Sequence, residues 1–153
     1  MNVQERLIEL GINLPEASPP VASYFPVVVW EGVAYISGQL PFIDGQLVTG
    51  RLGEDVGLER GVAAARACAL MILAQLKAAM IPLDHVDRIV KLGVFVNSTG
   101  DFTDQPKVGN GASDLMVDIF GDAGKHARSA VGVPALPLGA AVEVDAVIAL
   151  HPA

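Results

Sequence analysis

The stretch that decides the fold is ARSAVGVPALPLGAAVEVDAVIAL, residues 127–150. Side chains alternate in character along residues 127–133 and again along residues 141–150, and this period of two is typical of β-strands. Prolines and a glycine in residues 134–139 predict a turn between the two segments. The sequence therefore predicts two consecutive strands, each with two distinct faces.

Working outward from these strands, the rest of the chain alternates between further strands and helices. The predicted strands are residues 27–30, 33–37, 46–49 and 88–96, the first two forming a hairpin around a tight turn. The predicted helices are a short one at residues 3–10 and two longer ones at 58–80 and 112–120, with 97–110 as a polar loop. This order favours an α+β two-layer sandwich, in which a mixed β-sheet carries the two main helices on one face.

The composition predicts one folded domain and argues against several protein classes. The chain has 153 residues, of which 52% are apolar, too many for a disordered chain. Its 10 Lys and Arg residues against 17 Asp and Glu give a net charge of −7, which opposes binding to nucleic acid. We expect a single domain over residues 1–153, with its core in residues 24–150 after an N-terminal helix and Pro-rich connector in residues 1–23.

Only 18% of the residues are charged, which covers the surface of a 153-residue monomer thinly. Large apolar patches rarely stay exposed, so a homo-oligomer that buries further apolar surface between subunits would explain this composition. An apolar monomer is the alternative.

The sequence carries no signal for a metal, a cofactor or a membrane. His85, His126 and His151 lack metal-ligand spacing, no nucleotide-binding glycine motif is present, and Cys68 is the single cysteine. The N-terminal residues do not resemble a signal peptide, and charged residues interrupt the most apolar helix, 58–80. We therefore expect a cytoplasmic protein without nucleic-acid or membrane partners.

Arg128 is the first candidate for a binding residue. It shares a strand face with Ala130 and Gly132, so two very small residues leave space beside a planar guanidinium that can bind an anion through two hydrogen bonds. A surface cation paired with some carboxylate fits the same pattern equally well.

Glu143 is the second candidate. It shares a strand face with Asp145, opposite four apolar residues, and on a strand adjacent to that of Arg128 a carboxylate could orient the guanidinium or activate water. A solvated face or a weak structural ion pair explains the same pattern, and the pattern does not choose between Glu143 and Asp145. In Ser37-Gly38, a glycine at a strand end permits close approach of a ligand to the backbone, although an ordinary strand end has the same composition.

Several of these segments together resemble the reactive-intermediate deaminase family, also called YjgF-like or endoribonuclease L-PSP-like. The matching segments are Ile36–Pro41, Val90–Val96, Ala127–Val133, Leu136-Pro137 and Val142–Ala146. Their order and spacing cover roughly residues 24–150, and the Arg-Ser…Leu-Pro…Val-Glu-Val series is fairly specific. Residues 102–106 and 110–115 are similar to a divergent branch of this family.

The resemblance implies a chorismate-mutase-like fold and a homotrimer with clefts between subunits. It also implies hydrolysis of reactive enamines and imines to 2-keto acids and ammonia, without a cofactor. By this resemblance, Arg128 binds the substrate carboxylate and Glu143 orients a water molecule. Ser37 and Gly38 line the cleft, and Tyr24 lies at the spacing of a cleft tyrosine.

Two residues depart from the family pattern: Gly100 stands where an asparagine is usual, and the substrate-binding position Ala130 often holds a cysteine. These changes alter the pocket wall, so a trimeric, chaperone-like binder of small carboxylates without turnover is the alternative function. A ribonuclease, which an older family label suggests, is disfavoured because no Lys or Arg follows residue 128.

Overall fold

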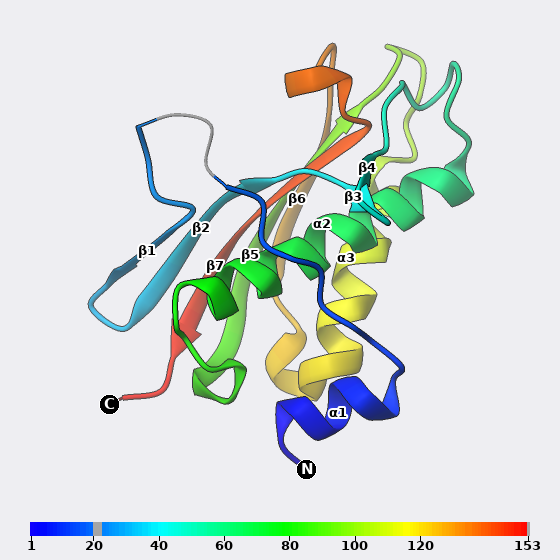
Figure 1. The fold of residues 1–153 in the computed structure, drawn as a ribbon. Helices are drawn as coiled ribbons and strands as arrows, with labels where there is room; N and C mark the ends of the chain where they lie inside the picture. Colours follow the sequence, from blue (N-terminus) through cyan, green and yellow to red (C-terminus); the bar gives the residue numbers. More distant parts are fainter. Residues whose placement is uncertain (20–22, 153) are drawn as a thin grey trace.

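A five-stranded mixed sheet forms one layer of the molecule and two helices form the other (Figure 1). The computed structural model describes residues 1–19 and 23–152; Pro20 of the predicted connector lies outside them. The strands of the sheet, in spatial order, are β1 (Val27–Trp30), β2 (Val33–Gln39), β7 (Val142–Leu150), β5 (Val86–Asn97) and β6 (Ala127–Val133). Strands β5 and β6 are parallel, and the other neighbours are antiparallel.

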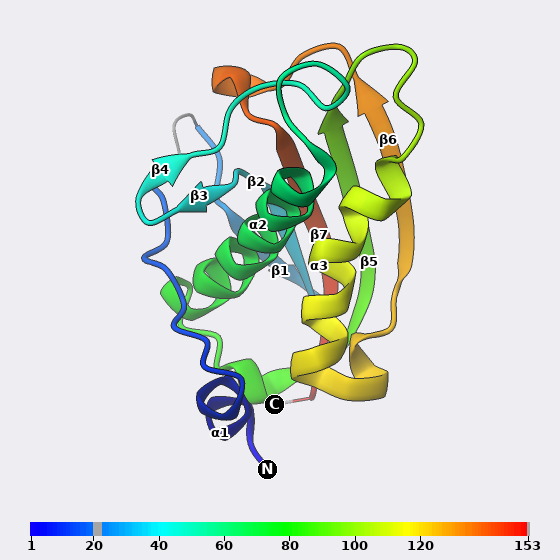
Figure 2. The ribbon, with the colours of Figure 1, turned by 90° about the vertical axis from the view of Figure 1, so that its right-hand side faces the viewer.

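Helices α2 (Leu58–Ala78) and α3 (Gln105–Phe120) lie side by side on one face of the sheet (Figure 2). The short helix α1 (Val3–Glu9) packs at one end of this layer through its buried Leu7. Three short 3₁₀ helices complete the chain: η1 (Leu83–His85), η2 (Gly121–Gly124) and η3 (Pro137–Gly139). The predicted α+β sandwich with its two main helices on one sheet face is therefore confirmed.

The core lies between the sheet and the two helices. Along β7, Val142, Val144, Ala146 and Ile148 are buried and alternate with half-buried residues, as the sequence pattern predicts. Cys68 of α2 is fully buried, and this burial raises the pKa of its thiol well above the ordinary range. Helix α2 is long and apolar enough to span a membrane, but 67% of its most apolar window is buried inside the protein, as in a core helix.

Two elements differ from the sequence prediction. Helix α3 begins at Gln105, seven residues before the predicted start, in a segment that we expected to be a loop. The strand predicted at 46–49 is shorter, β4 (Gln46–Leu47), and it pairs only with β3 (Phe42–Ile43) in a separate two-stranded ribbon. The main sheet therefore has five strands, and the ribbon lies beside α2.

No helix of residues 1–19 and 23–152 covers the second face of the sheet. Alternation and strand pairing place Val28, Trp30, Tyr35 and Val131 on this open face, and each is at least 45% exposed in the single chain. Large apolar side chains that converge on one sheet face are typical of a surface that another subunit covers.

Candidate functional site

One pocket brings together four of the six residues that the sequence analysis selected. Tyr24, Ser37, Gly38 and Glu143 line a pocket of about 420 Å³ at the end of β2, below Leu138 of η3. A volume of this size suits a small organic molecule. The pocket therefore forms a candidate cleft, which the remaining two residues, Arg128 and Ala130, do not reach.

Gly38 leaves room for the neighbouring carboxylate of Glu143. A Cβ atom built on Gly38 would lie only 2.7 Å from Cδ of Glu143, closer than real Cβ contacts occur. The pairing between β2 and β7 shifts register between Ile36 and Gln39, which is a local irregularity of the kind that redirects side chains near functional sites. The Ser37-Gly38 segment thus lets Glu143 lie directly against the backbone.

Two buried glutamines line the same pocket. The Gln75 side chain donates to the carbonyl of Ser18 at 2.8 Å and to Oε1 of Gln39 at 3.1 Å, and Gln39 donates to the carbonyl of Ser37. Both glutamines are only 5% exposed. The sequence pattern alone does not mark them as site residues, although a glutamine inside the most apolar helix is a usable signal. They fix the cleft wall by linking the N-terminal connector, α2 and β2.

The carboxylates of β7 have different surroundings. Burial, together with the negative charge of Asp145, raises the pKa of Glu143 above its ordinary value. Burial also raises the pKa of Asp145, but the backbone N–H of Gly93 and the charge of Lys91 oppose the shift. Asp145 lines a separate hollow on the open face with Lys91. The structure therefore distinguishes the two: Glu143 faces the candidate cleft, and its environment favours the exchange of a proton.

Arg128 and Glu143 do not meet within one chain. The idea that their strands are adjacent is wrong, because β5 lies between β6 and β7. Leu92 of β5 pairs with Arg128 on one side and with Ala146 on the other, so these residues share the helix-covered face. Phe95 pairs with Glu143, which places Glu143 on the open face. The two candidate residues therefore lie on opposite faces of the sheet.

The guanidinium of Arg128 lies against the N-terminal half of α3. It donates hydrogen bonds to Asn110, Ser113 and the carbonyl of Pro106 at 3.0–3.2 Å. Ala130, one step along the same face of β6, is partly buried. None of the ion pairs between side chains of the described residues includes Arg128. The alternative interpretation, a surface cation paired with a carboxylate of the same chain, therefore has no support among these residues.

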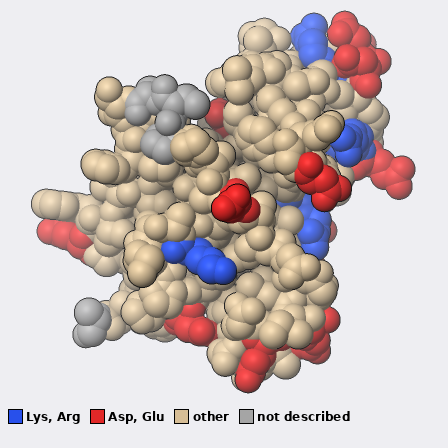
Figure 3. Space-filling view, viewed as in Figure 1, with Lys and Arg blue, Asp and Glu red and all other residues tan. Residues whose placement is uncertain are grey.

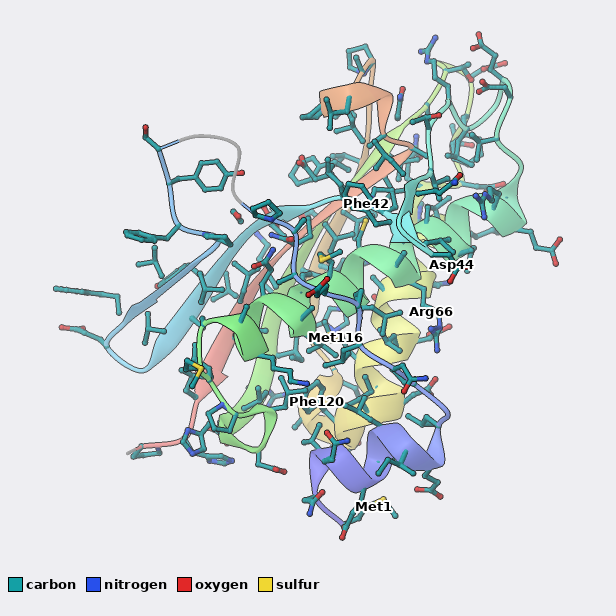
Figure 4. The ribbon with its side chains drawn as sticks, in the orientation of Figure 1. Met1, Phe42, Asp44, Arg66, Met116 and Phe120 are labelled. Carbon is teal, nitrogen blue, oxygen red and sulfur yellow. The ribbon has the colours of Figure 1, made fainter. Side chains whose placement is uncertain are left out.

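A larger hollow lies elsewhere on the molecule. It has a volume of about 700 Å³ and lies between α2, the N-terminal connector and the β3–β4 ribbon, where Arg66, Phe42 and Asp44 line it (Figure 4). Within residues 1–19 and 23–152, no cluster of three His, Cys, Asp or Glu side chains could hold a metal ion. On the face shown in Figure 3, Lys and Arg side chains are separate and lie among Asp and Glu, so that face offers no continuous basic surface.

Comparison with known proteins identifies the family. The model of the family described as "YjgF/chorismate mutase-like, putative endoribonuclease" matches residues 4–149. Protein TCP17 of Trypanosoma cruzi is 51% identical over 151 residues, which cover 97% of this chain and 94% of that protein. The crystal structure of Atu1372, a protein of unknown function from Agrobacterium tumefaciens, is 43% identical with a TM-score of 0.90, covering 97% of this chain and 92% of that one.

A second solved structure, from Shewanella oneidensis, covers 98% of this chain and 100% of its own, with a TM-score of 0.94 and 34% identity. The high TM-scores show that these solved structures share the α+β fold described above. The chain belongs to the YjgF/chorismate mutase-like family.

Proposed function

We propose that this protein hydrolyses small, reactive 2-imino and enamine acids to 2-keto acids and ammonia, in clefts between the subunits of a homotrimer. The observation that carries the proposal is the placement of Glu143. Its carboxylate is half-buried, has a raised pKa and lies over Gly38 in a pocket sized for a small molecule. A carboxylate in such surroundings is suited to take a proton from water and to return it.

The separation of Arg128 from Glu143 favours a cleft made by two subunits. The two side chains lie on opposite faces of one sheet, so a substrate of a few carbon atoms cannot contact both within a single chain. If β6 of one subunit lies beside the candidate cleft of its neighbour, Arg128 binds the carboxylate while the neighbour's Glu143 faces the imine carbon. The apolar open face gives such an association a physical driving force.

The chemistry then needs only side chains and water. The protonated imine carbon is already electrophilic, and Arg128 holds the carboxylate through its planar fork. Glu143 accepts a proton as water adds to the carbon, which gives a carbinolamine. Glu143 then returns this proton to the nitrogen, and the C–N bond breaks as the hydroxyl proton passes to the carboxylate. The products are a 2-keto acid and ammonia, which takes that last proton and leaves as ammonium.

The test is to generate a 2-imino acid in the assay with an amino acid oxidase and to measure the keto acid formed. We expect the wild-type protein to accelerate hydrolysis beyond the rate in buffer, and Arg128→Ala to lose the acceleration by about 10²-fold or more. Arg128→Lys is expected to fail as well, because an ammonium group cannot form the two parallel hydrogen bonds. Equal rates for all three proteins would overturn the proposal.

A second candidate function is a trimeric binder of small carboxylates without turnover. The departures at Gly100 and Ala130 favour it, because a glycine and an alanine lack the side-chain groups that the family resemblance implies at these two positions. Two results together would support this second function: the wild-type protein binds a 2-keto acid, and it does not change the rate of imine hydrolysis.

A further inference from the structure

A continuous chain of hydrogen bonds runs from Arg128 to the loop before β6. Nη1 of Arg128 donates to Oδ1 of Asn110 and to Oγ of Ser113, both at 3.0 Å. Nη2 donates to the carbonyl of Pro106 at 3.2 Å. All three acceptors belong to α3, so the helix holds the guanidinium in one plane.

The series of hydrogen bonds continues from Ser113 to His126. Oγ of Ser113 lies 2.8 Å from Nε2 of His126, and Nδ1 of His126 lies 2.6 Å from the carbonyl oxygen of Gly124. A carbonyl oxygen only accepts, so Nδ1 carries a proton and donates it to Gly124; in the tautomer with its single proton on Nδ1, Nε2 accepts from the hydroxyl of Ser113. The hydroxyl of Ser113 thus donates to His126 and accepts from Arg128.

This arrangement leaves part of the donor capacity of the guanidinium unused. Nη1 donates to two acceptors and Nη2 to one, which leaves the N–H of Nε and a second N–H of Nη2. In the described part of the chain these two donors have no acceptor. They remain available to a carboxylate, which forms strong, charge-assisted hydrogen bonds with a guanidinium.

Gly109 provides the space in which the guanidinium lies. A Cβ atom on this buried glycine of α3 would lie 3.2 Å from Nη1 of Arg128, tighter than ordinary contact. The helix therefore leaves space for Arg128 at Gly109, which has no side chain, and holds the guanidinium by hydrogen bonds to residues before and after it in α3.

We propose that Asn110, Ser113 and His126 are positioning residues, which hold Arg128 with its remaining N–H groups available as a preorganised receptor for the substrate carboxylate. This inference rests on the proposed function, since it gives Arg128 the same ligand. His126 acts indirectly, because it sets the direction of the Ser113 hydroxyl and does not contact the carboxylate.

The experiment measures binding of 2-oxobutanoate by calorimetry, which does not require turnover. We expect Ser113→Ala to weaken binding about tenfold, the loss typical of one charge-assisted hydrogen bond. His126→Phe should act similarly, and His126→Gln should restore much of the affinity because its side-chain oxygen can accept from Ser113. Ser129→Ala, on the other face of β6, is the matched control and should bind as the wild type does.

A double-mutant cycle separates positioning from a purely structural role. If Ser113 acts through Arg128, Ser113→Ala should weaken binding no further in an Arg128→Ala background. The inference alone is overturned if Arg128→Ala loses binding while Ser113→Ala and His126→Phe bind as the wild type does, or if the two losses simply add. If Arg128→Ala itself binds 2-oxobutanoate with unchanged affinity, the carboxylate receptor of the proposed function fails as well.

Discussion

At the scale of single residues, Glu143 can be tested as the group that handles the proton. Glu143→Gln preserves the shape of the side chain but replaces a proton acceptor with an amide. We expect turnover of a 2-imino acid to fall by about 10²-fold or more, while the affinity for 2-oxobutanoate changes little. Steady-state rates and calorimetry on the same protein preparation measure the two effects.

Asp145 provides the control for this experiment. It lies two residues along β7 on the same face, but in a different hollow, beside Lys91. Asp145→Asn should be nearly silent in both assays. A parallel loss of binding and turnover in Glu143→Gln would mean that Glu143 only supports the binding of the carboxylate. No change in either would place Glu143 outside the reaction.

The pKa of Glu143 also predicts how stability depends on pH. Because the folded protein raises this pKa above its ordinary value of 4.5, the charged carboxylate destabilises the fold. That penalty is absent below pH 4.5, where the group is protonated in both states, and it develops as the pH rises through the raised pKa. Glu143→Gln should therefore melt at a higher temperature than the wild type near pH 7 and at the same temperature near pH 4. A lower melting temperature near pH 7 would contradict this.

Sequence reasoning placed individual residues well but not their neighbours across the sheet. Alternation along single strands correctly put Glu143 with Asp145, and Arg128 with Ala130. It could not show that β5 separates β6 from β7, because the spatial order of strands depends on long-range pairing that leaves no local pattern. The same limit applies to Gln75, which meets Gln39 only after α2 packs on the sheet.

At the scale of elements, the contact between α2 and α3 depends on Gly111. A Cβ atom on Gly111 would collide with the backbone carbonyl of Val62, so the helices approach closely only because no side chain is there. We expect Gly111→Ala to destabilise the protein by about 1–3 kcal/mol in chemical denaturation, despite the better helix propensity of alanine. Gly100→Ala, whose Cβ would meet nothing within 4 Å, should change stability little.

These glycines also explain why the start of α3 was not predicted. Gly109, Asn110 and Gly111 all have low helix propensity, so the local sequence favours a loop. Tertiary contacts outweigh that preference, because Gly109 accommodates Arg128 and Gly111 packs against α2. The later part of the helix was predicted correctly, since Leu115, Met116 and Ile119 are spaced to bury one face.

At the scale of the whole molecule, the open sheet face predicts the state of association. Val131→Asp introduces a charge at an apolar position that is 45% exposed in the single chain. We expect light scattering to report a trimer for the wild type and a smaller species for Val131→Asp, with loss of 2-oxobutanoate binding. Ile8→Asp on α1, at a position 69% exposed, should leave the mass unchanged. A wild-type monomer at micromolar concentration would remove the intersubunit cleft.

The order of strands has a consequence for biosynthesis. Strand β7 lies at the centre of the sheet, between β2 and β5, yet the ribosome makes it after the other four strands. Until it emerges, the N-terminal hairpin and the β5–α3–β6 unit have no strand to join them, and apolar residues such as Ile36 and Leu92 lack their central partner. The nascent chain therefore exposes unpaired strand edges on both half-sheets until β7 is made, and exposed strand edges of this kind favour aggregation.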